Sequence, residues 1–287
     1  MWTILGALFG VVCILLLAVA VYDSNRFVTV NYRIEDPRIR KRVRLALLAD
    51  LHNKQYGKDN DRLLQAIRAQ KPDLILCAGD MITSVPGKTM EPAKDLIRKL
   101  AGEYPFYFAD GNHEHRICSD PETFAPMGEQ FCESLEKSGV CRLVNENVSL
   151  PSLGLRIYGL DLDRDKYRKF GRPRLSREEL RRLLGDAPEA DFVILLAHNP
   201  AFFKAYAAWG SDLTLSGHLH GGVMRLPWVG GVLSTSFRVF PKYDGGMFEE
   251  AGRRMVVSRG LGGHTIPVRI FNPAELVIID LIPKDRE

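Results

Sequence analysis

The amino-acid sequence predicts a layered α/β domain with a central sheet, preceded by one transmembrane helix. Three observations predict this architecture. No charged side chain occurs between Trp2 and Tyr22. After that run, short apolar stretches alternate with amphipathic ones, and the later part of the chain is richer in strand-like segments. The composition, 46% hydrophobic and 26% charged in 287 residues, is typical of a globular protein that buries a core.

The first 22 residues are expected to be a membrane anchor. About 20 consecutive apolar residues are enough to cross the hydrocarbon core of a bilayer. A buried helix of a soluble domain is one alternative, and a cleaved signal peptide is another, because Ala18-Val19-Ala20 resembles a cleavage site. No Lys or Arg precedes the run, however, and the run is longer than the apolar part of a typical signal peptide. We therefore expect a single-pass anchor over residues 1–22 that contacts membrane lipid.

Basic residues follow this anchor, and none precedes it. The excess of Lys and Arg after the span favours a cytoplasmic location for the rest of the chain, with an extracytoplasmic location as the alternative. Residues 23–42 are expected to be a basic connector. Its arginine-rich end, with the adjoining residues up to 44, is expected either to touch anionic headgroups or to be a solvated linker.

The folded domain is expected over residues 43–287. Helical spacing of Leu63, Leu64 and Ile67 predicts a helix over 59–70. Ser176 and Glu179 have the spacing of a capping box, which predicts the start of another helix. Strands are expected at 44–48, 73–78, 105–109, near 142, and at 156–159, 192–197, 213–215, 255–258 and 276–281, and further helices at 91–100 and 127–137.

Five of the strand-like runs end in polar residues that are able to bind a metal ion. Sites in α/β sheets form beyond the carboxyl ends of the strands, so we expect these residues to meet at one edge of the sheet. Five of the seven histidines lie at these ends, which chance placement explains poorly. The five segments are Asp50-Leu51-His52, Gly79-Asp80, Gly111-Asn112-His113-Glu114, Ala197-His198-Asn199 and Gly217-His218-Leu219-His220.

The residue types suit the hydrolysis of a phosphate ester. This reaction needs a strong nucleophile at neutral pH and neutralisation of the phosphoryl charge, and two metal ions about 3.5–4 Å apart supply both. Mixed Asp, His and Asn donors suit Mn, Fe, Zn or Co better than Mg or Ca alone. Taken singly, each segment is equally compatible with a turn or a structural histidine. Together they predict a centre of two divalent metal ions.

These segments resemble the calcineurin-like metallophosphoesterase superfamily, which shows Asp-x-His, Gly-Asp, Gly-Asn-His-Asp/Glu, a lone His and Gly-His-x-His in the same order. The resemblance covers Asp50 to His220. The N-terminal span and the segments 217–222, 225–227 and 258–262 are similar to a membrane-associated bacterial branch, which includes proteins acting on phosphate-bearing lipids or sugar nucleotides. The resemblance also implies a two-layered β-sandwich flanked by helices.

The resemblance implies a role for each matching residue. His113 would lie near the leaving-group oxygen as proton donor or charge stabiliser, and the nucleophile would be a metal-bridging hydroxide. The first metal would be held by Asp50, His52 and His220, the second by Asn112, His198 and His218, and Asp80 would bridge the two.

Four residues depart from the shared pattern or lie outside it. Glu114 replaces the more usual Asp, and if its carboxylate orients His113, the longer side chain alters reach but not charge. Arg116 is a candidate contact for substrate phosphate because of its planar guanidinium. His264 lies in a Gly-rich loop that is a second candidate for substrate binding. For these two, and for His115, a role as an ordinary surface or loop residue is the alternative.

The co-occurrence of an anchor and a metal centre predicts a phosphohydrolase that cleaves phosphoester or pyrophosphate bonds of a membrane-proximal substrate, either a lipid-linked phosphate or an acylated sugar nucleotide. A phosphodiesterase for soluble nucleotides and a noncatalytic metal-binding scaffold are the alternatives. The net charge of +4 predicts no specific nucleic-acid binding. The five cysteines are expected to be free thiols, with a Cys118–Cys132 bridge as the alternative.

Overall fold

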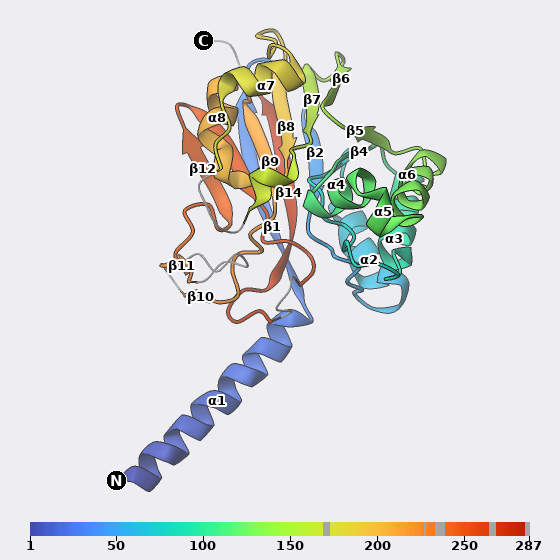
Figure 1. Ribbon diagram of the computed structural model, residues 1–287. Helices are drawn as coiled ribbons and strands as arrows, with labels where there is room; N and C mark the ends of the chain where they lie inside the picture. Colours follow the sequence, from blue (N-terminus) through green and yellow to red (C-terminus); the bar gives the residue numbers. More distant parts are fainter. Residues whose placement is uncertain (169–172, 227, 233–238, 264–267, 285–287) are drawn as a thin grey trace.

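Two six-stranded sheets form the centre of the molecule, and helices flank them (Figure 1). The structure, a computed structural model, describes residues 1–168, 173–226, 228–232, 239–263 and 268–284. Its β-sandwich with flanking helices confirms the predicted fold class. His264 lies outside the described residues.

The first sheet has the strand order β1-β14-β2-β3-β4-β5. The strands from β2 to β5 are parallel, whereas β14 is antiparallel to β2 and parallel to β1. The strands are β1 (Phe27–Asp36), β2 (Val43–Leu48), β3 (Leu74–Cys77), β4 (Phe106–Ala109), β5 (Cys141–Leu143) and β14 (Ala274–Pro283).

The second sheet has the order β12-β13-β9-β8-β7-β6, with parallel strands from β13 to β7. Its strands are β6 (Glu146–Leu150), β7 (Leu155–Leu160), β8 (Phe192–Ala197), β9 (Leu213–Ser216), β12 (Gly246–Glu250) and β13 (Arg253–Val257). A separate hairpin pairs β10 (Arg225–Leu226) with β11 (Gly230–Gly231).

The helices divide between the two outer faces of the sandwich. The first group accompanies the first sheet and comprises α2 (Asp61–Gln70), α3 (Glu91–Ala101), α4 (Asn112–Ser119), α5 (Pro121–Phe124) and α6 (Met127–Lys137). The second group covers the second sheet and comprises α7 (Arg177–Leu184) and α8 (Phe203–Trp209). Short 3₁₀ turns are η1 (Lys58–Asn60), η2 (Arg164–Tyr167) and η3 (Pro200–Phe202).

The central strands are apolar on both faces because both faces are covered. On β2, Leu45 and Leu47 pack between the sheets against residues such as Ile194 of β8. The alternate residues Ala46 and Leu48 face the helices of the first group. Successive side chains of a strand point to opposite faces, so a strand buried on both sides reads as a continuous apolar run.

The chain between the anchor and Val43 differs from the predicted connector. It forms β1, an edge strand that is paired with β14 over ten residues. A ten-residue strand is about 33 Å long. The arginines that were considered for headgroup contact therefore lie at the far end of β1 from the anchor, where Arg38 pairs with Asp212 and Arg44 with Asp280. This position favours the alternative in which these arginines do not contact lipid.

The N-terminal helix α1 (Trp2–Ser24) projects away from the sandwich (Figure 1). It is long and apolar enough to cross a bilayer, a property that signal sequences share. Within this helix only Ala20 and Asp23 are buried. Its location in a membrane stays a prediction.

Two of the cysteines lie close together on neighbouring helices. The Sγ atoms of Cys118 in α4 and Cys132 in α6 are 3.6 Å apart, and both side chains are free thiols. Arg142 donates a hydrogen bond to each of them.

Candidate metal centre

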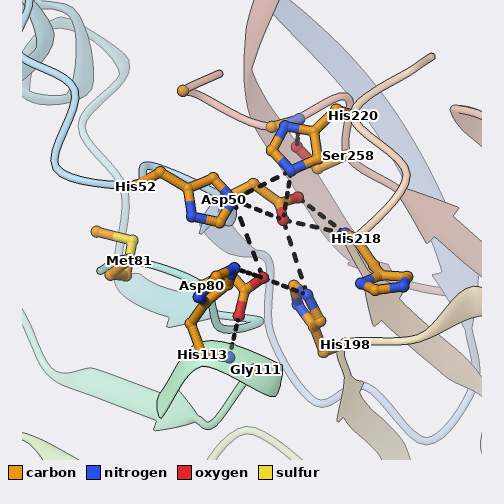
Figure 2. A network of polar contacts seen from close by, with 12 residues as sticks. Asp50, His52, Asp80, Met81, Gly111, His113, His198, His218, His220 and Ser258 are labelled. Atoms are coloured by element: carbon orange, nitrogen blue, oxygen red, sulfur yellow. Dashed lines mark hydrogen bonds and ion pairs between the residues drawn. The ribbon is translucent and has the colours of Figure 1, made fainter. Parts of the chain in front are cut away.

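The five polar segments meet at one end of the sandwich, and they come from both sheets. In the first sheet, β2 leads to Asp50, β3 leads to Asp80, and β4 leads to the start of α4. In the second sheet, β8 leads to His198, and β9 leads to His218. The sequence predicted that these residues meet at the edge of a single sheet. The structure corrects this, because strands of two stacked sheets bring them together, and their side chains face one another (Figure 2).

The convergence creates three overlapping groups of potential metal ligands. Within each group, the ligand atoms lie within 4.8 Å of one another. His52 and Asp80 each belong to two of the groups, and of these two side chains only the Asp80 carboxylate has two oxygens with which to bridge a pair of ions. The groups are Asp50, His52 and His220; His52, Asp80 and His113; and Asp80, His198 and His218.

The distances between these side chains indicate a site for cations. His220 Nε2 lies 3.2 Å from Asp50 Oδ1, and His198 Nε2 lies 3.0 Å from Asp80 Oδ2. His52 Nε2 and His220 Nε2 face each other at 3.1 Å. Two imidazole nitrogens at this separation need a shared proton or a nearby cation, since two lone pairs would repel.

Asn112 lies at the start of α4, between Gly111 and His113, and carries a further oxygen donor. Its Oδ1 atom is buried and accepts no hydrogen bond from the described part of the chain. A buried polar atom without a partner is costly, and coordination of an ion removes that cost. The donor set of carboxylate oxygens, imidazole nitrogens and one amide oxygen therefore fits divalent transition metals.

Backbone carbonyls orient two of the histidines. His52 Nδ1 lies 3.1 Å from Ile82 O, and His198 Nδ1 lies 2.6 Å from Ala78 O. An Nδ1 proton donated to a carbonyl leaves the Nε2 lone pair free to point into the site. This arrangement is usual for histidines that bind metals.

Five of the seven candidate ligands have a left-handed backbone. Non-glycine residues seldom adopt this conformation, and such residues cluster at functional sites where the surrounding structure holds them. The positive φ angles are 53° at Asp50, 48° at His52, 56° at Asp80, 74° at His218 and 52° at His220.

Two glycines of the motifs pack directly against the candidate carboxylate ligands. A Cβ atom at Gly111 would collide with Asp80 Oδ1, and one at Gly217 would collide with Asp50 Oδ2. The backbone beyond each glycine then binds the same carboxylate. His113 N donates to Asp80 Oδ1 at 2.8 Å, and His218 N donates to Asp50 Oδ2 at 2.9 Å.

Glu114 holds the backbone around Asp80 and does not contact the His113 ring in the described hydrogen bonds. It is fully buried, and its Oε1 accepts hydrogen bonds from Met81 N and Ile82 N. Its Oε2 accepts from Asp80 N and Gly111 N. Burial, together with the charges of Asp80 and Asp110, raises the pKa of Glu114 to about 8, against the effect of these donors. The carboxylate at this position therefore links the loops after β3 and β4.

His113 is oriented by Ser84. The Ser84 N–H donates to His113 Nδ1 at 2.8 Å, so Nδ1 is the acceptor nitrogen of the ring. A neutral His113 must then carry its proton on Nε2. This Nε2 atom lies 3.9 Å from Asp80 Oδ2 and faces the centre of the site. His113 can thus present a proton to a group bound beside Asp80.

The charges of the site favour cations. Burial opposes ionisation of Asp80, but His198, His113 and His52 hold the pKa of this carboxyl well below its usual range. Burial likewise lowers the pKa of His198, but Asp80 and Asp50 outweigh it and raise the value to about 10. Two carboxylates that stabilise positive charge beside His198 in this way would also stabilise a bound metal cation.

The residues outside the shared pattern have other surroundings. Arg116 is exposed on α4, and its guanidinium lies 5.2 Å from the ring centre of Phe124. His115 Nδ1 pairs with Asp161 at 2.8 Å. Sequence reasoning missed Tyr167, whose ring lies 5.3 Å from that of His218. A single tyrosine in a basic segment has no motif that would have revealed it.

Two cavities open on either side of the candidate ligands. The first, which we call the anchor-side cavity, has a volume of about 530 Å³ and is lined by His52, His113, Lys54, Lys88 and Ser24, the last residue of α1, among others. The second, which we call the far cavity, has a volume of about 800 Å³. It is lined by His218, Tyr167, Phe202, Lys204 and Lys242, among others.

Comparison with known proteins identifies the family. Residues 43–222, more than half of the chain, match the model described as calcineurin-like phosphoesterase. An uncharacterized metallophosphoesterase of Campylobacter jejuni is 28% identical over 86% of this chain, and the chain spans 61% of that protein. An uncharacterized metallophosphoesterase of Aquifex aeolicus is 27% identical, with 88% of this chain and 90% of that protein covered.

A further relative carries a more specific name. The Escherichia coli phosphodiesterase YaeI is 26% identical, with 83% of this chain and 82% of that protein covered. Among solved structures, the NAD nucleotidase of Haemophilus influenzae is 15% identical with a TM-score of 0.42, and covers 77% of this chain and 45% of that one. The match over residues 43–222 contains every strand end that contributes a candidate ligand. The chain belongs to the calcineurin-like phosphoesterase family of metal-dependent phosphoester hydrolases.

Proposed function

We propose that this protein is a membrane-anchored phosphohydrolase with two metal ions, and that it cleaves a phosphoester or pyrophosphate bond of a substrate held in the bilayer. The observation that carries this proposal is the place where the anchor joins the domain. α1 meets the sandwich at the same edge at which the candidate ligands gather.

The direction of the strands explains this coincidence. β14 is antiparallel to β2, so Val277 near its start pairs with Leu47 near the end of β2. β1 is parallel to β14, and its first residue Phe27 pairs with Ala274. The chain therefore leaves α1 at the carboxyl edge of β2, next to Asp50. A bilayer that contains α1 would lie close to the site.

The candidate ligands divide into two sets around a shared carboxylate. When bound, two divalent ions would supply a water of lowered pKa as nucleophile and would neutralise charge on the phosphoryl group. The backbone bonds of Glu114 and the carbonyls of Ala78 and Ile82 hold several ligands in place. We assign Asp50, His52 and His220 to the first ion, Asn112, His198 and His218 to the second, and Asp80 to both.

His113 is proposed as the proton donor to the leaving group. Its Nδ1 accepts from Ser84, and its Nε2 carries the proton toward the site. The ring also lines the anchor-side cavity. A leaving group protonated by His113 would thus depart on the side of α1, which suits a product that stays in the membrane.

The walls of the anchor-side cavity support an anionic, bilayer-held substrate. Lys54 and Lys88 add positive charge to it, and Ser24 brings the end of α1 into its wall. Juxtamembrane lysines attract anionic headgroups. A lipid-linked phosphate or an acylated sugar nucleotide has the charge and the acyl chains that this placement requires.

A phosphodiesterase for soluble nucleotides is the second candidate. The far cavity favours it, because Tyr167, Phe202, Lys204 and Lys242 offer apolar surface and positive charge. The Escherichia coli relative is named a phosphodiesterase, which agrees with the bond type of this candidate. In this case α1 would only attach the protein to the membrane and would have no part in substrate binding.

The two candidates are separated by one comparison in liposomes that hold the full chain. Turnover of a long-chain phosphate lipid in the bilayer would be compared with that of its short-chain soluble analogue and of a soluble dinucleotide. We expect the bilayer substrate to be turned over with at least about tenfold higher kcat/KM. Equal rates for the two lipids, or a preference for the dinucleotide, would reject the membrane-proximal substrate. Protection of the domain from protease in spheroplasts would support its predicted cytoplasmic side, and digestion from outside would reverse it.

A further inference from the structure

A patch of exposed apolar side chains lies on the hairpin β10–β11 and the loop beside it. Among the described residues that follow α1, nine large apolar side chains are exposed, and four of them line one hollow. Trp228 at the hairpin tip is fully exposed. Exposed apolar clusters of this kind mark surfaces that bind a protein or a membrane. The apolar patch consists of Leu226, Trp228, Val229 and Phe271.

Hydrogen bonds connect the apolar patch to the end of α1. Met224, just before β10, forms a bridge with Ile270, and Arg225 N donates to Ile270 O at 3.0 Å. Two residues further, Asn272 N donates to Asp23 of α1 at 3.1 Å. The hairpin lies on the side of the domain from which α1 projects (Figure 1). The position of the patch relative to α1 is therefore determined by direct contacts.

The hairpin carries little charge that would oppose burial. Arg225 is the only charged residue between Val223 and Val232. Its guanidinium is already paired, because Nη1 donates to Asp244 Oδ2 at 2.9 Å. Burying an unpaired charge is costly, whereas this pair leaves mainly apolar surface to be desolvated.

We propose that the apolar patch inserts into the interfacial layer of the bilayer that holds α1, as a second membrane contact of this protein. The inference rests on the proposed anchoring by α1. Tryptophan is enriched at the membrane–water interface because its ring is amphipathic. α1 emerges beside the patch, so a bilayer around α1 would lie against the patch.

Two contacts would fix the orientation of the domain on the bilayer. One contact leaves the domain free to tilt about the end of α1, whereas a second contact removes that freedom. Asn272, next to Phe271, also donates to His220 O at 2.8 Å, so the inserted loop supports a candidate ligand. The anchor-side cavity would thereby be held facing the headgroups.

Tryptophan fluorescence of the full chain in liposomes tests this proposal. Trp2→Phe leaves Trp228 and the buried Trp209, so quenching reports Trp228. Lipids brominated near the carbonyl end of the acyl chains should quench its emission. Soluble acrylamide should quench it at least about twofold less than it quenches the exposed tryptophan of a control variant, as expected for an interfacial ring. The control Glu249→Trp in a Trp2→Phe, Trp228→Phe background places an exposed tryptophan at the end of β12 away from the site and should respond to acrylamide alone.

Three outcomes would count against parts of the account. If Trp228 is open to acrylamide and unaffected by brominated lipid, the second contact is rejected. If it is shielded from both, a protein surface covers the patch, and the bilayer contact is likewise rejected. Trp228→Phe leaves Trp2 as the reporter on α1. Loss of lipid quenching at Trp2 would reject the anchor itself, which separates that failure from failure of the patch.

Discussion

The two cavities meet at the candidate ligands but differ in what surrounds them. The anchor-side cavity reaches His113 and ends at Ser24, the last residue of α1. The far cavity reaches His218 and is lined by residues of η2 and α8. A phosphoryl group between them would direct its two substituents to opposite sides. Under the proposed function, the chemistry would be shared between the cavities, whereas protonation of the leaving group and access from the bilayer would belong to the anchor-side cavity alone.

Among the residues that line the anchor-side cavity, His113 should have the largest effect on the rate of hydrolysis when it is replaced. His113→Gln removes the Nε2 proton donor, and loss of a general acid costs on the order of 10²–10⁴-fold in rate. The loss should be largest for an alkyl phosphate and much smaller for p-nitrophenyl phosphate, whose leaving group needs no proton. Steady-state kinetics with both substrates tests this. Equal losses for the two substrates would show that His113 has another role.

Replacement of Glu114 should lower activity equally for substrates bound in either cavity, because this side chain positions candidate metal ligands and lines neither cavity. Glu114→Gln keeps the shape but places an amide against four backbone N–H donors. A change in such a supporting group typically costs about 10–100-fold in metal affinity or activity. Isothermal titration with Mn²⁺ measures the affinity, with the exposed Glu122→Gln as control. Unchanged affinity and rate would contradict the positioning role.

Replacing the lysines that line each cavity should have the smallest effect on activity, and it should show which cavity binds the substrate. Lys54→Ala with Lys88→Ala should raise KM for a bilayer-held phosphate roughly 30-fold, since two juxtamembrane lysines at about 1 kcal/mol each contribute about 2 kcal/mol of attraction to an anionic surface. The matched pair Lys204→Ala with Lys242→Ala should leave that KM nearly unchanged. The comparison is made in liposomes at low salt. A larger effect from the second pair would favour the far cavity and a soluble nucleotide.

The candidate site could be predicted closely from the sequence because its ligands follow apolar strands. Asp50, Asp80 and His198 each come directly after a buried run, and strand direction brings such ends together. The number of sheets could not be predicted in this way. A strand covered on both faces has the same pattern in one sheet or in two, so the sandwich came only from the family resemblance.

Other features depend on contacts between distant parts of the chain. Residues 27–36 form an edge strand and not a connector because β1 pairs with β14, which joins segments about 250 residues apart. Tyr167 comes close to His218 only through the packing of η2. The motif shows where Glu114 lies in the sequence, but the four backbone N–H groups that donate to its carboxylate come from two separate loops. Sequence patterns report local periodicity, and these contacts are not local.

Metal content and turnover of the full chain with and without Asp80 test the central claim most directly. A truncation at Val43 would remove β1, so the intact protein in detergent is used. We expect about two ions per chain and Mn-dependent hydrolysis of p-nitrophenyl or bis-p-nitrophenyl phosphate. Asp80→Ala should lose at least one ion and on the order of 1000-fold in rate, because several kcal/mol of charge stabilisation disappear. The exposed Glu129→Ala should behave as wild type. A wild-type chain that binds no metal, or full activity in Asp80→Ala with its fold intact, would contradict the account.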